Sequence, residues 1–242
     1  MITAAALCPW PPALVRELTG SDPVLPELRR ACATAVSRLA GGDPELVVVV
    51  GPAAVTGTWD AASRLQVASL APLAGSGGTA ALPLSLGLGA WLLDQAGYRG
   101  RRALQAVGYD EPASSCVQLG RQLRDSGQRT ALLVLADGSA RRTPRAPGHY
   151  DERALAFDRE VQAAIAAGDF ARLRAVDQDL ARELMATGRP GWQVMAGALD
   201  DDTSRAPAST TGSNTGPSAD ILYQDDPFGV AYLVAFIDPA GN

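Results

Sequence analysis

Short, continuous hydrophobic runs alternate along the chain with longer stretches in which hydrophobic residues recur every three or four positions. The runs are typical of strands that are buried on both faces. We expect such strands at residues 2–7, 46–50, 103–107 and 130–136. The helical spacing predicts helices at residues 25–39, 84–96 and 117–123. Strands that alternate with helices predict an α/β fold with a mainly parallel, mixed central sheet and helices on both faces.

The second half of the chain predicts two further helices between residues 151 and 188. Asp151 is placed to cap the first helix and Asp169 the second, and glycines end both. The small, apolar segment 193–199 favours a strand, with a helix as the alternative. Segments 221–223 and 230–237 predict a closing pair of strands.

A single domain covering residues 1–242 accounts for the whole pattern. At 242 residues and 47% hydrophobic content, the chain is long enough to bury one large core. Residues 200–219 are rich in Asp, Ser, Thr, Gly and Pro and have no large apolar side chain, so we expect a mobile loop there.

The charged residues exclude several classes of function. The net charge of −5 argues against a general nucleic-acid binder, and we expect no nucleic acid as a partner. All 21 basic residues are arginines. Without lysine the chain has no Schiff-base chemistry, no P-loop lysine and no kinase-type strand lysine.

The cysteines and hydrophobic runs indicate a cytoplasmic protein. Cys8, Cys32 and Cys116 are odd in number and far apart, which favours free thiols over a disulfide framework or a zinc site. We predict no signal peptide, because no cationic segment precedes the apolar start. We also predict no membrane span, because the apolar stretch 82–93 falls short of the ~20 residues that cross a bilayer.

The most informative motifs lie between residues 130 and 199. A strand ends in Leu133–Ala140 (LVLADGSA), and later pieces follow in a characteristic order: Pro147-Gly-His-Tyr150, Phe157-Asp158, Gly168-Asp169 and Trp192–Ala198 (WQVMAGA). In this order the pieces resemble the catalytic (B) subunit of class III extradiol dioxygenases and its Memo-like relatives. The resemblance implies that family's α/β fold, with a cleft at the strand ends.

The same resemblance shows where this chain departs from the family. Family members hold Fe(II) with two histidines and a glutamate and use a further histidine as acid/base. This chain has Cys8-Pro9-Trp10 and Gly51-Pro52-Ala53 at the two ligand positions, and Ser139-Ala140 where the family has a serine-histidine pair. With one histidine in the whole chain, a two-histidine iron site cannot form within it. We therefore predict no metal, no cofactor and no conventional dioxygenase activity.

These departures predict a protein that binds a small anionic ligand in the former active-site cleft. The expected lining of that cleft is Cys8, Trp10, Ala53, Asp137, Ser139, Ala140 and Arg141. Arg141, Arg142 and Arg145 follow a strand end, where open α/β sheets bind ligands, and arginines suit carboxylate or phosphate. A solvated basic surface is the alternative reading of these arginines.

Two other functional classes remain open. One is a structural or interaction protein that acts through a homodimer or partner surface. The other is a metal-independent enzyme that uses Asp137 or His149 as acid/base. His149 reaches Asp137 only if its loop folds back, and a solvated loop histidine is the alternative. The chain has no G-x-S-x-G elbow, so we do not expect a Ser139–His149–Asp137 triad.

Overall fold

A seven-stranded mixed sheet forms the centre of the computed structural model, which describes residues 1–19, 24–65, 82–200 and 217–239. The strands lie in the order β3-β4-β2-β5-β1-β7-β6. Their bounds are β1 Ile2–Cys8, β2 Leu46–Ala53, β3 Gly57–Trp59, β4 Arg102–Gly108, β5 Thr130–Leu135, β6 Ser218–Asp225 and β7 Tyr232–Asp238. The expected α/β fold, with helices on both faces of a mainly parallel sheet, is confirmed.

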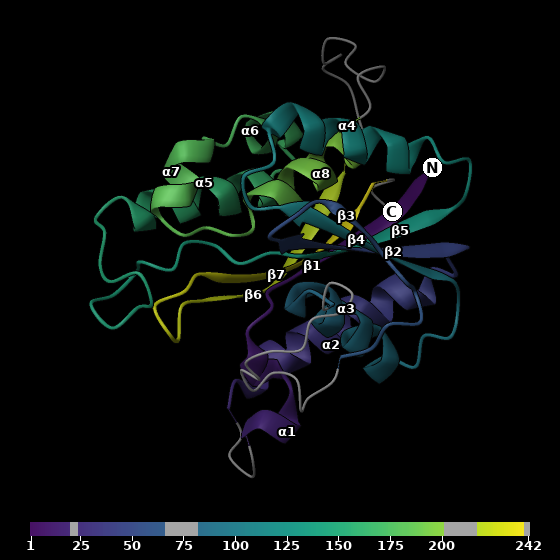
Figure 1. Ribbon diagram of the computed structural model, residues 1–242, viewed down its shortest axis with the longest axis horizontal. Helices are drawn as coiled ribbons and strands as arrows, with labels where there is room; N and C mark the ends of the chain where they lie inside the picture. Colours follow the sequence, from purple (N-terminus) through teal and green to yellow (C-terminus); the bar gives the residue numbers. More distant parts are fainter. Residues whose placement is uncertain (20–23, 66–81, 201–216, 240–242) are drawn as a thin grey trace, which may run out of the picture.

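Helices cover the two faces of the sheet in separate layers (Figure 1). One layer holds α2 and α3, with α1 and the short 3-10 helix nearby: 3-10 helix Pro12–Leu14, α1 Arg16–Thr19, α2 Pro26–Gly41 and α3 Leu84–Gln95. The other layer contains α4 Ala113–Arg124, α5 Ala154–Ala166, α6 Phe170–Arg174, α7 Gln178–Glu183 and α8 Arg189–Leu199.

The four central strands β4, β2, β5 and β1 run parallel, so their carboxyl ends share one edge of the sheet. Strand β7 pairs antiparallel with β1, with Leu7 opposite Ala235, and β6 and β3 extend the sheet at its two sides. Four consecutive valines at 47–50 place apolar side chains on both faces of β2. A strand that is covered by helices on both sides requires this pattern.

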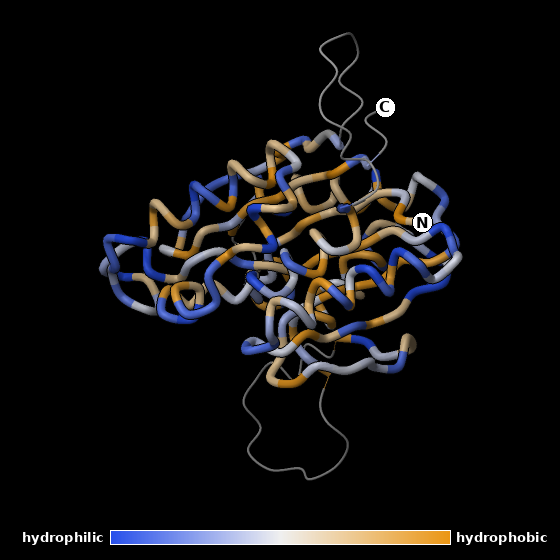
Figure 2. The backbone as a smooth tube through the Cα atoms, turned by 90° about the horizontal axis from the view of Figure 1, so that it is seen from above, coloured by the Kyte–Doolittle hydropathy of each residue, from blue (hydrophilic) through white to orange (hydrophobic). Residues whose placement is uncertain are grey.

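The hydrophobic core is divided by the sheet into two clusters. One contains Phe157, Trp192 and the inward side of α8, and the other contains Leu28, Leu39 and Leu86 of α2 and α3. Hydrophobic stretches run through the middle of the molecule, and hydrophilic ones lie mostly at its outside (Figure 2). Among the described residues, no helix is both long and apolar enough to cross a membrane.

The predicted strand at 193–199 is wrong, because this segment belongs to helix α8. Helix α8 lies between α4 and the sheet, and every residue from Arg189 to Ala198 is buried. A helix that is buried all round has no polar face, so a short apolar run does not distinguish it from a buried strand.

The segment after residue 150 differs from the prediction in two further details. Asp151 does not cap α5, which begins at Ala154; its carboxylate accepts a hydrogen bond from the Arg153 N–H instead. The expected second helix is divided into α6 and α7. Asp169 caps α6, as predicted, and Asp177 caps α7. Most of the predicted mobile loop, residues 201–216, lies outside the described residues.

Candidate functional site

The ends of β1 and β5 bring the first pair of predicted site residues together. The two strands are parallel neighbours, with Cys8 paired to Leu135, so the segments that follow them leave the sheet side by side. The Ala136 N–H donates to the Cys8 carbonyl at 2.9 Å. One step further, the Trp10 N–H donates to Oδ1 of Asp137 at 2.9 Å. Asp137 and Trp10 thus form one site at the carboxyl edge of the sheet.

The carboxyl group of Asp137 is desolvated, although the residue keeps some contact with solvent. Burial raises the pKa of Asp137 to about 7, and the hydrogen bond from the Trp10 N–H opposes this only in part. No ion pair joins Asp137 to a cation among the described residues. The group therefore exists in both its neutral and its charged form near neutral pH.

Three further side chains are close enough to sense the charge of Asp137. Burial raises the pKa values of Tyr109 and Tyr232, and the negative charge of Asp137 adds to both shifts. The thiol of Cys32 hydrogen-bonds with Cys8, which raises the pKa of Cys32, and burial and Asp137 raise it further. The sequence analysis did not assign Tyr109, Tyr232 or Cys32 to the site. Tyr109 had a usable signal, since it lies two residues after the predicted strand 103–107.

Two buried N–H groups in this part of the chain have no hydrogen-bond partner among the described residues: Nε1 of Trp10 and Nε of Arg141. An unpaired buried donor costs about 1–3 kcal/mol, so each is a place where an acceptor would be stabilising. Trp10 belongs to the Asp137 site through its backbone. Arg141 is held separately, through its carbonyl oxygen, which accepts from the Asp151 N–H at 3.0 Å.

Ser139 is fully buried and turned to the helix α5 rather than to Asp137. Its N–H and hydroxyl donate to the two carboxylate oxygens of Asp158, at 2.8 and 2.5 Å. Arg142 donates to the same carboxylate at 3.1 Å and pairs with Asp226 at 3.0 Å. Burial raises the pKa of Asp158, while Ser139 and Arg142 oppose this shift. The hydroxyl of Ser139 is thus part of a structural network.

The remaining predicted lining residues have mainly backbone roles. Ala53 ends β2, and its carbonyl accepts from the Tyr109 N–H at 3.0 Å, which joins the ends of two parallel strands. Ala140 is buried and is held at both backbone groups, by the Leu184 carbonyl and the Gly148 N–H. Neither alanine brings a reactive group to the site.

His149 lies in an exposed turn with a left-handed backbone, at a φ of 61°. Its N–H donates to the Ala146 carbonyl at 2.9 Å. Within the described ranges no hydrogen bond joins His149 to Ser139 or Asp137. The described residues therefore do not assemble a Ser139–His149–Asp137 triad, and of the two acid/base candidates only Asp137 lies at the carboxyl edge of the sheet.

The described part of the chain contains no group of three or more His, Cys, Asp or Glu side chains that is close enough to hold a metal ion. The thiols nearest to Asp137 belong to Cys8 and Cys32, which are buried and hydrogen-bonded to each other. A small buried thiol of this kind packs as a hydrophobic group.

Comparison with known proteins informs the fold. No protein-family model matches the chain, and no curated protein matches it. Among solved structures, the uncharacterized protein JW3007 from Escherichia coli K12 is similar, with a TM-score of 0.53 and 14% sequence identity. The likeness covers 97% of this chain and 99% of the other. The chain therefore shares its α/β fold with that protein.

Proposed function

We propose that this protein binds a small anionic ligand, without a metal, at the carboxyl edge of its parallel strands. The site contains Asp137, Trp10 and Tyr109, on a scaffold that resembles the catalytic subunit of class III extradiol dioxygenases. The observation that carries the proposal is the desolvated carboxyl of Asp137, which has no counter-cation among the described residues and is bonded to the backbone N–H of Trp10, a residue whose buried indole N–H is also unpaired. Perturbed carboxyl groups of this kind concentrate at functional sites.

The donors around Asp137 explain why the ligand is an anion. The indole N–H of Trp10 has no acceptor among the described residues, and Tyr109 and Tyr232 add hydroxyl groups that are protonated at neutral pH, since burial raises their pKa values above the ordinary 10. Below a pH of about 7 Asp137 also carries a proton that it can donate. A carboxylate or phosphate oxygen would pair with these donors, and its charge would favour the protonated form of Asp137 further.

If an anion binds the protonated form of Asp137, its affinity should depend on pH. We expect binding of benzoate, which stays a monoanion over this range, to weaken as the pH rises through about 7, by up to about tenfold per pH unit, because the ionised Asp137 repels the anion. Calorimetric titration in chelator-containing buffer measures this directly. Benzylamine serves as the cationic control, and its binding should not weaken with rising pH.

Two variants connect the pH dependence to the site. Asp137→Asn keeps an oxygen for the Trp10 N–H and should remove the pH dependence, while Trp10→Phe removes the indole donor and should weaken binding about tenfold at every pH. Asp125→Asn, at an exposed position away from the sheet edge, is the matched control. Failure of every anion to bind the wild type at low pH, or unchanged binding in both site variants, would contradict the proposal.

A second candidate function is general acid/base catalysis by Asp137. The pKa of about 7 favours it, because an acid/base group works best when its pKa is near the operating pH. The expected result is proton-transfer activity on a bound ligand that is lost in Asp137→Asn. Ligand binding that persists in this variant would then separate the catalytic role from the binding role.

A further inference from the structure

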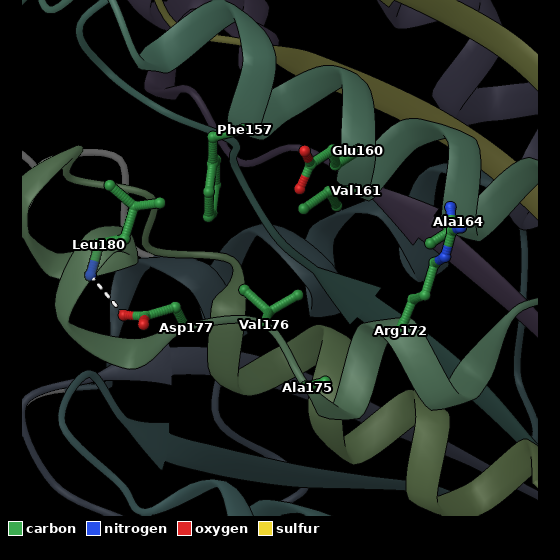
Figure 3. Close-up of a pocket in the computed structure, with 9 residues that line it drawn as sticks. All are labelled: Phe157, Glu160, Val161, Ala164, Arg172, Ala175, Val176, Asp177 and Leu180. Atoms are coloured by element: carbon green, nitrogen blue, oxygen red, sulfur yellow. Dashed lines mark hydrogen bonds between the residues drawn. The ribbon is translucent and has the colours of Figure 1, made fainter.

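A pocket lies on the α8 face of the sheet, between α5 and the α6–α7 segment (Figure 3). Its volume is about 450 Å³, within the range of small-molecule sites. The pocket residues of α5 belong to the core cluster on the α8 face of the sheet, whereas Cys8, Cys32 and Tyr232 beside Asp137 belong to the other cluster. The two sites are therefore separate.

The break between α6 and α7 keeps this pocket from being filled. Helix α6 has only five residues, and Asp177 caps the start of α7 by accepting the Leu180 N–H at 2.8 Å. The connecting residues at 175–176 bring two small side chains, Ala175 and Val176, to the pocket. On the α5 side, Ala164 is also small. Together these residues form a concave, mostly apolar wall.

The polar groups of the pocket give it a negative charge. The Glu160 carboxylate projects from α5 into the space beside Phe157, and no ion pair or hydrogen bond engages it among the described residues (Figure 3). Arg172 also lines the pocket, but its guanidinium already pairs with Asp169 at 3.3 Å. Asp177 is the second carboxylate and is used as a helix cap. Glu160 is thus the charge that remains available to a ligand.

We propose that this pocket binds a small organic monocation, a primary or substituted ammonium with an apolar body. The ammonium pairs with Glu160 and lies next to the Phe157 ring, whose face attracts cations. The apolar body fills the space against Val161, Val176 and Leu180. The Glu160 carboxylate favours a positively charged ligand. The apolar wall favours an organic amine over a hydrated inorganic cation.

Phenethylamine is the probe for this pocket, and 2-phenylethanol is its neutral analogue. Saturation-transfer NMR and calorimetric titration of the whole protein should show that the amine binds more tightly than the alcohol. Glu160→Gln should reduce amine affinity about twofold to fivefold, the range of an exposed ion pair, and leave alcohol binding unchanged. Glu152→Gln, an exposed position outside the pocket, is the matched control and should behave as the wild type.

A second variant tests the pocket without touching the core. Ala175 is exposed, so Ala175→Trp should fill the space and abolish binding while the protein stays folded. Equal binding of amine and alcohol, or amine binding that survives both Ala175→Trp and Glu160→Gln, would overturn the proposal. Preferential binding of the zwitterion phenylalanine would also overturn it, since that result assigns the specificity to Arg172. Asp137→Asn should leave amine binding unchanged.

Discussion

Asp137 and Asp158 are both removed from solvent, but only Asp158 has a full set of partners. Asp158 accepts from the N–H and hydroxyl of Ser139 and from Arg142. Among the described residues, the Asp137 carboxylate accepts from the Trp10 N–H alone. Asp158 is therefore a structural carboxylate, whereas most of the hydrogen-bonding capacity of the Asp137 carboxyl is unused in this part of the chain.

The raised pKa of Asp137 makes the stability of the protein depend on pH. The unfolded carboxyl has a pKa near 3.8 and the folded one about 7, so the native state binds this proton more tightly. The stabilising contribution is therefore complete below about pH 4, falls as the pH rises and is lost above about pH 7. Chemical denaturation should show that, as the pH rises from about 4 to about 7, the free energy of unfolding of Asp137→Asn increases by about 2–4 kcal/mol relative to that of the wild type. If the free energy of unfolding depended on pH in the same way in both proteins, the raised pKa of Asp137 would be refuted.

The Asp158 network predicts a different response. Asp158→Ala should lower the free energy of unfolding by about 3 kcal/mol, because it leaves the buried Ser139 donors unpaired and removes a charge partner of Arg142. Ser139→Ala removes a single donor and should cost about 1–2 kcal/mol. Urea denaturation measures both. A larger loss in Ser139→Ala than in Asp158→Ala would contradict this account of the network.

At the scale of elements, the contact between α4 and α8 depends on two glycines. A side-chain carbon added at Gly120 would overlap the Val194 carbonyl oxygen, and one added at Gly197 would overlap the Val117 carbonyl oxygen. Neither carbonyl belongs to a flexible side chain, so the helices themselves would have to separate.

The cost of that separation is a measurable prediction. Gly120→Ala should destabilise the protein by about 3 kcal/mol, although alanine is the better helix former by about 1 kcal/mol. Gly41→Ala, in the last turn of α2, is the matched control: its side chain would meet no atom within 4 Å, and it should be neutral or slightly stabilising. Thermal and urea denaturation compare the two. A neutral Gly120→Ala would show that α4 and α8 do not pack this closely.

The sequence predicted some helices and strands correctly and missed others. Helical spacing located α2, α4 and α5 because each has one polar face, and four hydrophobic runs located the parallel strands. Helix α8 has no polar face, because it fills the space between α4 and the sheet, and its segment was assigned to a strand. Strand β3 pairs antiparallel with one neighbour and has three residues. Three residues are too few to show the alternation of polar and apolar side chains that predicts a strand.

At the scale of the whole molecule, the sequence predicted a mainly parallel sheet with helices on both faces. Because the strands are parallel, Cys8, Ala53 and Asp137 lie at one edge of that sheet. Which side chains then meet depends on the course of the loops. The turn after Asp137 directs Ser139 to α5, and the left-handed turn at His149 directs that residue to solvent. No residue pattern encodes these directions.

The position of β1 in the middle of the sheet has a consequence for biosynthesis. Strand β1 is made before all the others, yet its two neighbours are β5 and β7, which follow only after most of the chain has been synthesised. Until then its very apolar sequence has no strand to pair with, and such unpaired edges associate readily with other chains. A nascent chain of this protein should therefore depend on ribosome-associated chaperones until β7 completes the sheet.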